Sequence, residues 1–219
     1  MDDTSRQRDI ACVHDAHQAL TEHLAAMSGG PGADSALPSR LPGWTRGHVL
    51  THIARNADSF VRLLDAAGRG EVVTQYERGA EGRNADIEAG ATRDWATLVD
   101  DVGSSAARLE DVFAAQHRWD LAMTNSQGES VSHADLPFRR LREVLVHHAD
   151  LGDQGFTPAD WPSDYVREEL RRMEMQYTAR QPMGVSGLPD AATAAAPLER
   201  LCWLLGRGDL EGLEPAGIF

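Results

Sequence analysis

The feature that most constrains the fold is the helical spacing of apolar residues in four separate stretches. From about Ser5 to Met27, apolar side chains recur three or four residues apart. Similar stripes run from about Thr45 to Ala67, from Asp86 to about Gln116, and from Asp135 to Gly152 or Gly155. Amphipathic helices of this length bury their stripes against one another. The pattern therefore predicts a mainly α protein built on a four-helix bundle.

Between the third and fourth stretches, the spacing of apolar residues changes from helical to alternating. Trp119, Leu121 and Met123 alternate with polar residues, and a turn sequence at 125–128 separates them from Val131. Alternation of this kind followed by a glycine-containing turn indicates a short β-hairpin.

The residue composition changes at Phe156, after which prolines and a tryptophan indicate a linker. We expect a helix from about Ser163 to Arg180, a strand within Met183–Leu188, and a helix from Leu198 to Leu205. The sequence thus predicts two domains. Residues 1–155 form the bundle, and residues 156–219 form a small C-terminal α/β domain that packs on it, because about 60 residues make a small core.

Charge and composition narrow the partners and the compartment. The net charge of −13 argues against binding to nucleic acid or to an anionic membrane. No uncharged run approaches the ~20 residues that span a bilayer, and the first residues contain no apolar signal-peptide core. The two cysteines, Cys12 and Cys202, lie far apart and outside any C-x-x-C motif. We expect a cytoplasmic protein.

Two of the predicted helices carry metal-ligand residue types at helical spacing. His48 and His52 lie four residues apart on the second, and Glu143, His147 and His148 lie on the fourth. A catalytic zinc ion takes three protein ligands and keeps an open position. His52, Glu143 and His147 supply such a set, and His48 or His148 can take the place of one of them. The alternative is chance, because nine histidines are present.

Two arginines are candidates for binding a carboxylate. Arg83 precedes the predicted third helix, and Arg207 follows the last one. A planar guanidinium binds a carboxylate through two hydrogen bonds, although arginine is also an ordinary surface residue. The sequence contains no H-E-x-x-H, G-x-S-x-G or P-loop motif, so metalloprotease, serine hydrolase and nucleotide-phosphate chemistry have no support.

Several motifs together resemble one family. Residues 42–58, PGWTRGHVLTHIARNAD, closely resemble the mycothiol-dependent maleylpyruvate isomerases, as do residues 83–90, RNADIEAG, and 142–152, REVLVHHADLG. Residues 204–209, LLGRGD, are similar to the C-terminal signature of that family. The resemblance covers nearly the whole chain in the same order.

The resemblance implies a DinB-like four-helix bundle that holds a divalent metal, usually zinc, followed by a small α/β domain. The metal ligands of the family map onto His52, Glu143 and His147, the set that the spacing indicated independently. The catalytic arginine of the family falls on Arg207.

The implied activity is the cis-to-trans isomerisation of maleylpyruvate to fumarylpyruvate in gentisate breakdown, with mycothiol as the thiol cofactor. The metal keeps the thiol deprotonated, and the thiolate adds to the electron-poor double bond, which then rotates before the thiol is eliminated. Arg207, together with Arg83 at the substrate, is expected to stabilise the negative charge that develops.

Two other functions remain open at this stage. The same fold resembles mycothiol S-transferases, which share the metal and thiol steps but release the adduct as product. A non-catalytic metal-binding or ligand-binding protein would also keep the bundle, because one fold serves several functions. The sequence indicates a small-molecule substrate and mycothiol as partners, and it does not indicate an oligomeric state.

Overall fold

The chain consists of two compact units, Met1–Gly155 and Phe156–Phe219. We describe them from a computed structural model, which places residues 3–124, 130–181 and 187–217. That each unit folds as a domain of its own remains a prediction.

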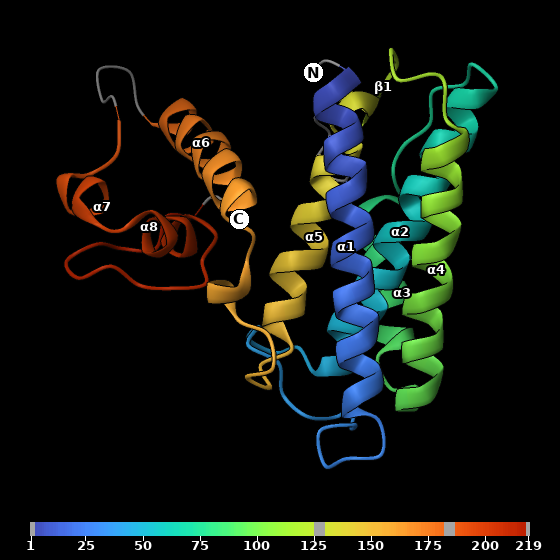
Figure 1. Cartoon of the computed structure of the whole chain (residues 1–219), viewed down its shortest axis with the longest axis horizontal. Helices are drawn as coiled ribbons and strands as arrows, with labels where there is room; N and C mark the ends of the chain where they lie inside the picture. Colours follow the sequence, from blue (N-terminus) through green and yellow to red (C-terminus); the bar gives the residue numbers. More distant parts are fainter. Residues whose placement is uncertain (1–2, 125–129, 182–186, 218–219) are drawn as a thin grey trace. The chain divides into compact units, whose positions relative to one another are not determined.

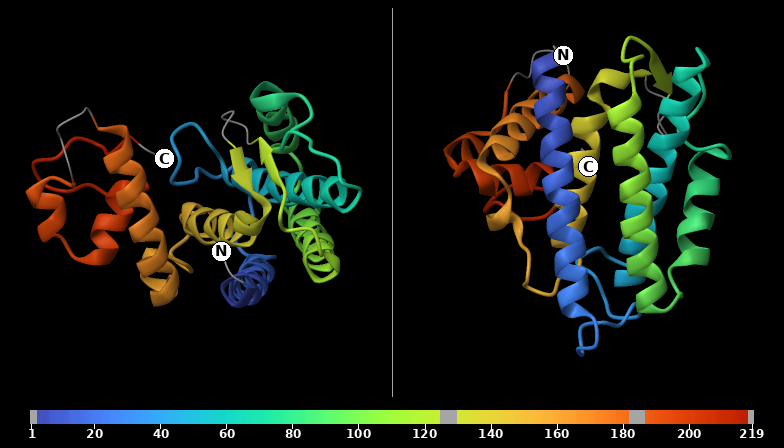
Figure 2. Two further views of the ribbon diagram at one scale, coloured as in Figure 1. Left: turned by 90° about the horizontal axis from the view of Figure 1, so that it is seen from above. Right: turned by 45° about the vertical axis from the view of Figure 1, so that its right-hand side comes forward.

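The first unit is a bundle of four long helices. These are α1 (Asp3–Met27), α2 (Arg46–Gly68), α4 (Trp95–Ala115) and α5 (Leu136–Asp150), which lie side by side in Figure 1. Seen from above in Figure 2, the four helices surround a common core. A shorter helix, α3 (Gly79–Gly90), packs on α2. The mainly α bundle predicted from the apolar spacing is confirmed.

The apolar stripes that predicted the helices form the core of the bundle. Each helix contributes side chains that are almost fully buried, at positions that follow the helical period. They are Val13, Leu20 and Leu24 of α1, Val49, Ile53, Phe60 and Leu64 of α2, Leu98, Val102 and Leu109 of α4, and Leu141, Val144 and Leu145 of α5.

The third predicted helix, from Asp86 to about Gln116, is wrong in its extent. The structure has two helices there, since α3 ends at Gly90 and α4 begins at Trp95. The side chain of Asp94 accepts hydrogen bonds from the backbone N–H and the hydroxyl of Thr97, so it caps the N-terminus of α4. Arg83 accordingly lies within α3 and not before a helix.

The predicted hairpin is present. Strand β1 (Ala122–Thr124) pairs antiparallel with β2 (Ser130–Ser132), and Met123 lies opposite Val131. The turn residues 125–129 lie outside the described part of the chain. A 3₁₀ turn, His133–Asp135, then leads into α5. Ser132 caps this turn, whereas the Asp135 side chain, at the first residue of the predicted fourth stretch, makes no capping bond at α5.

The regular secondary structure in the described part of the second unit is helical. It contains a 3₁₀ turn at Pro158–Asp160 and the helices α6 (Ser163–Arg180), α7 (Asp190–Ala194) and α8 (Pro197–Leu204). Helices α6 and α8 pack together, with the rings of Tyr177 and Trp203 5.4 Å apart. The strand expected at Met183–Leu188 lies mostly outside the described residues, and the described residues 156–181 and 187–217 contain no strand.

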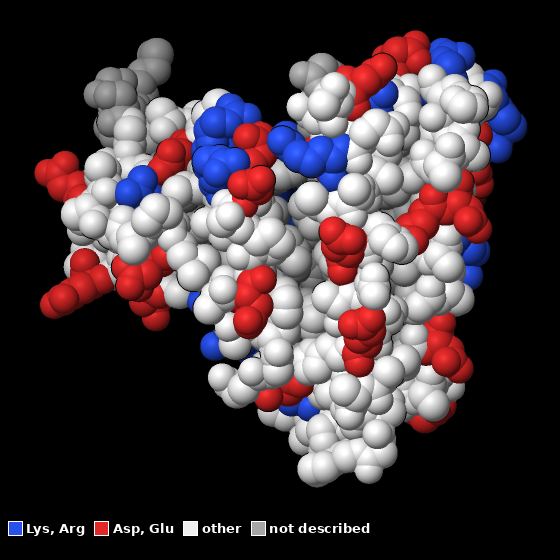
Figure 3. Space-filling model, in the orientation of Figure 1, with Lys and Arg blue, Asp and Glu red and all other residues white. Residues whose placement is uncertain are grey.

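Acidic groups are spread over the surface, as the net charge of −13 requires. On the face drawn in Figure 3, acidic side chains are scattered among uncharged ones, and basic side chains gather in a few small groups. No helix in the described part of the chain has both the length and the apolar character needed to cross a bilayer.

Candidate metal centre

Helices α2 and α5 bring together the three residues predicted as metal ligands. His52 Nε2 lies 2.8 Å from Glu143 Oε2, and His147 Nε2 lies 3.5 Å from the same oxygen. One ligand atom from each residue lies within 4.8 Å of the other two. We call His52, Glu143 and His147 the triad. Both histidines are nearly buried, with 3 % and 6 % of their surface exposed.

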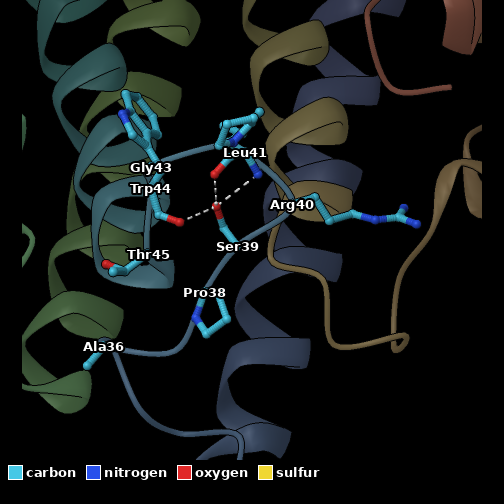
Figure 4. Close-up of a pocket in the computed structure, with 9 residues that line it drawn as sticks. Ala36, Pro38, Ser39, Arg40, Leu41, Gly43, Trp44 and Thr45 are labelled. Carbon is cyan, nitrogen blue, oxygen red and sulfur yellow. Dashed lines mark hydrogen bonds between the residues drawn. The ribbon is translucent and has the colours of Figure 1, made fainter. Parts of the chain in front are cut away.

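The position of His52 depends on how α2 begins. Thr45 caps the helix through its hydroxyl, which accepts from the His48 backbone N–H. Nearby, Ser39 holds the preceding loop closed by hydrogen bonds to the backbones of Leu41 and Trp44 (Figure 4). Residues of this loop line a cavity of about 440 Å³. The loop therefore fixes the N-terminal turns of α2, on which His52 lies.

Hydrogen bonds also tie this end of α2 to the end of α5. Arg46 donates through Nε to the carbonyl of Leu151, and through Nη1 to the carbonyl of Gly32. The backbone N–H of Arg40 donates to the carbonyl of Asp150. Because both helices are joined beside the triad, two of its members that lie 91 positions apart in the sequence keep a fixed separation.

A close approach of α3 to α2 positions Arg83. Gly47 has no room for a side chain, because a Cβ there would overlap the carbonyl of Ala91. Arg83 of α3 reaches the triad, and its Nη2 lies 3.1 Å from His52 Nδ1. Its guanidinium carbon lies 6.0 Å from the centre of the Tyr76 ring.

An acidic residue that the sequence analysis missed orients His147. The residue is Asp150, which is fully buried and accepts a hydrogen bond of 2.9 Å from Nδ1 of His147. Asp150 lies three residues after His147 on the same side of α5, and that spacing was the available signal. A carboxylate on the far nitrogen of a histidine fixes the ring and leaves Nε2 for a metal.

The electrostatics of the triad keep Glu143 ionised. Burial opposes its charge, but hydrogen bonds from His147 and His52 hold its pKa well below the usual value. Burial lowers the pKa of His52 to about 4, so this ring is neutral at pH 7. Burial also acts to lower the pKa of His147, but hydrogen bonds to Asp150 and Glu143 raise it overall.

The donor set fits a divalent metal. Two imidazole nitrogens and one carboxylate oxygen form a known class of catalytic zinc site. Zinc bonds of about 2.0–2.2 Å in a tetrahedral arrangement place the donor atoms about 3.4 Å apart. The separation of His147 from Glu143 is already close to this value, and that of His52 from Glu143 is about 0.6 Å shorter. A small rotation of one side chain would admit the ion.

The two alternative histidines are used elsewhere. His48 accepts a hydrogen bond from the backbone N–H of Thr45 through Nδ1, and its Nε2 lies 3.3 Å from Glu88. His148 faces α1, where its Nε2 lies 2.7 Å from Nδ1 of His23. Neither belongs to the group of residues that could hold a metal in the described part of the chain.

An aromatic side chain that the sequence analysis did not place at the site lines the triad. The ring of Trp44 lies edge-on to His52, with the ring centres 5.7 Å apart, and stacks on His48 at 6.0 Å.

The predicted catalytic residue, Arg207, belongs to the second unit and lies just after α8. Its Nη1 donates to the carbonyl of Leu205, and its catalytic role remains a prediction.

Comparisons with known proteins agree with this architecture. Two solved structures are similar over 93 % of this chain and 90 % of theirs. One is the mycothiol-dependent maleylpyruvate isomerase, with 24 % identity and a TM-score of 0.81; the other is its H52A mutant, with 23 % and 0.80. Likeness at this identity establishes the fold. A comparison with curated protein sequences finds no match.

The family itself follows from the sequence. The model of the mycothiol maleylpyruvate isomerase N-terminal domain matches residues 13–152, which include the whole triad and most of the bundle. The chain therefore belongs to the mycothiol maleylpyruvate isomerase family.

Proposed function

We propose that this chain is a metal-dependent isomerase that uses mycothiol and converts maleylpyruvate, or a related cis-enoyl acid, to the trans isomer. The observation that carries the proposal is the convergence of His52 and His147 on one oxygen of Glu143. Family membership and the fold shared with the mycothiol-dependent maleylpyruvate isomerase support the same activity.

His52, Glu143 and His147 would hold the metal, and zinc is the ion that this donor set fits best. When bound, the metal keeps a thiol deprotonated at neutral pH, so that mycothiol can add to the electron-poor double bond and later leave. Asp150 keeps the Nδ1 proton of His147 in place and directs Nε2 toward the site.

Two arginines are assigned to the substrate. Arg83 lies beside the triad with part of its surface exposed, and its guanidinium can bind a carboxylate through two parallel hydrogen bonds. Arg207 is proposed as the catalytic cation that stabilises the negative charge developing beside the double bond. The ring of Trp44 lies edge-on to His52 and presents an apolar surface on that side of the triad.

The test is a turnover assay on the purified full chain. The ultraviolet absorbance of maleylpyruvate is followed as it becomes fumarylpyruvate, with zinc and mycothiol added singly and together. Turnover that needs both establishes the proposal. A stable mycothiol adduct on another electrophile would assign the chain to the S-transferases. Bound zinc with neither reaction would assign it to the non-catalytic proteins. A cytoplasmic location remains part of the proposal.

Arg207→Ala tests the role of the second unit. We expect the variant to keep one zinc ion per chain and to lose turnover by at least about 100-fold, because an electrostatic partner of the transition state is removed. Arg167→Ala is the matched control, since Arg167 is an exposed arginine of the same unit, paired with Asp164. Normal turnover in Arg207→Ala would show that another residue supplies the cation.

A further inference from the structure

The contact between Arg83 and His52 fixes where the imidazole carries its proton. Arg83 Nη2 lies 3.1 Å from Nδ1, whereas Glu143 contacts the other ring nitrogen. A guanidinium has only donors, so Nδ1 must accept this hydrogen bond. The single proton of the neutral ring is then on Nε2, which donates to Glu143 over 2.8 Å.

Metal binding requires the other arrangement. Nε2 is the nitrogen of His52 that faces Glu143, and a metal bound there occupies its lone pair. The proton of the neutral ring must then lie on Nδ1. An N–H at Nδ1 and an N–H of Arg83 are both donors, and two donors cannot form a hydrogen bond with each other.

We infer that Arg83 and the metal exclude each other at His52, so that metal loading releases Arg83 from the ring. The inference rests on the proposed function, because it takes His52 as a metal ligand. The ring is neutral in both states and only the position of its proton differs. Whether Arg83 contacts His52 therefore depends on whether the metal is bound.

The second histidine of the triad, His147, has a hydrogen-bond acceptor at Nδ1, whereas His52 has a donor there. His147 donates from Nδ1 to Asp150, so the proton that metal binding requires at Nδ1 is already in place. Only His52 has to place a new proton on Nδ1 when the metal binds, because Arg83 occupies that nitrogen in the metal-free chain. This difference assigns the change to one side of the triad, the side on which α3 carries Arg83.

Release gives Arg83 a function at the substrate. Its other contacts in the described residues are with uncharged side chains, namely a hydrogen bond from Nη1 to Asn84 and the interaction with Tyr76. A released guanidinium presents two parallel N–H groups, which match the carboxylate of an enoyl acid. The metal thus prepares the anion-binding side chain before the substrate arrives.

The direct test reads the tautomer of His52 by ¹⁵N NMR of the histidine-labelled full chain, with the signal assigned by its absence in His52→Gln. We expect the proton on Nε2 in the metal-free protein and on Nδ1 after one equivalent of zinc. A proton on Nδ1 without metal would overturn the inference. A bare Nδ1 in the zinc form would overturn it as well.

Zinc affinity, measured by competition with a chelator, supplies a second readout. Arg83→Met removes the donor and should bind zinc about tenfold more tightly than the wild type. Arg83→Gln should bind more tightly still, because its carbonyl can accept from Nδ1–H. Arg78→Met is the matched control for lost charge, since Arg78 lies just before α3 and pairs with Asp86. We expect its affinity to stay within about twofold of the wild type.

The outcomes separate this inference from the proposed function. Equal zinc affinity in the wild type, Arg83→Met and Arg83→Gln would overturn the inference and leave the metal site intact. Equal tightening in Arg78→Met and Arg83→Met would also overturn it, because charge alone would explain the effect. A wild-type chain that binds no zinc would overturn the proposed function and the metal-dependent release together.

Discussion

The bundle contains two clusters of the same composition, two histidines and one glutamate. One is the triad, and the other consists of His14 and His17 of α1 with Glu110 of α4, which we call the α1–α4 cluster. In the triad both histidines approach the same oxygen of Glu143. In the α1–α4 cluster they take different oxygens of Glu110, at 2.8 and 2.7 Å. Convergence on one point distinguishes a ligand set from an ordinary hydrogen-bond network.

The remaining nitrogens of the two clusters differ as well. His17 is occupied on both sides, because Nδ1 bonds Glu110 and Nε2 accepts from Arg140. Arg140 is fully buried and also donates to the carbonyl of Ile53 and to Asn56. His14 is largely exposed. The α1–α4 cluster therefore joins helices of the bundle, whereas the triad keeps its donor atoms directed at one site.

The largest expected effect separates the two clusters directly. His52→Ala should lose the bound zinc and reduce turnover by at least about 1000-fold, because two ligands hold the ion poorly. His14→Ala should keep both. Zinc is measured by mass spectrometry of the purified chain, and folding by circular dichroism. Unchanged turnover in a folded, zinc-free His52→Ala would contradict the metal mechanism.

Sequence spacing predicted the triad but could not recognise the α1–α4 cluster as its counterpart. Glu143 and His147 lie four residues apart on one helix, so their common side follows from helical geometry alone. Glu110 reaches His17 over 93 positions, and only the packing of α1 on α4 brings them together. Which oxygen each histidine approaches depends on side-chain rotamers, which no sequence pattern specifies.

The same distinction applies to the fold. The apolar stripes predicted the long helices because their period reports a buried face. They failed at Asp86–Gln116, where Ile87 and Trp95 both fit one continuous stripe although the chain breaks between them. The break depends on the helix cap at Asp94, and the spacing of apolar residues carries no information about a single capping residue. Asp150 was missed for a similar reason, because its role at His147 is a side-chain contact.

A smaller effect tests the residue behind the triad. Asp150→Asn should weaken zinc binding about 10- to 100-fold, because the amide no longer fixes the Nδ1 proton of His147 as a carboxylate does. Glu110→Gln makes the equivalent change in the α1–α4 cluster and should leave zinc affinity unaltered. Chelator competition measures both. Equal zinc affinities in the two variants would remove Asp150 from the metal site.

The smallest predicted effect is the pH dependence of stability that His17 contributes. Burial lowers the pKa of His17 from its ordinary value of 6.5 to about 4, so the folded state disfavours its protonation. Below pH 6.5 the unfolded chain takes up a proton that the folded chain excludes, and the free energy of unfolding falls until about pH 4. At about pH 5 this loss amounts to about 1–2 kcal/mol.

Two neighbours of His17 modify the curve without reversing it in this range. A hydrogen bond from His17 holds the pKa of Glu110 below its usual value, and the stability that Glu110 contributes is lost only as the pH falls below about 4.5. The pKa of His14 is raised, mainly by its hydrogen bond to Glu110, which acts in the opposite direction, but this side chain is exposed and the effect is screened. Arg140 keeps its charge, because burial lowers its pKa only to about 10.

His17→Gln isolates this contribution, because the amide can donate to Glu110 and accept from Arg140 without titrating. Urea unfolding at about pH 7 and pH 5 should show that the wild type loses about 1–2 kcal/mol more than the variant. Parallel losses would mean that His17 takes up its proton in the folded state. The α1–α4 cluster would then accept a proton that its hydrogen bonds are expected to exclude. Only the approach of both histidines to one glutamate oxygen would still distinguish the triad from it.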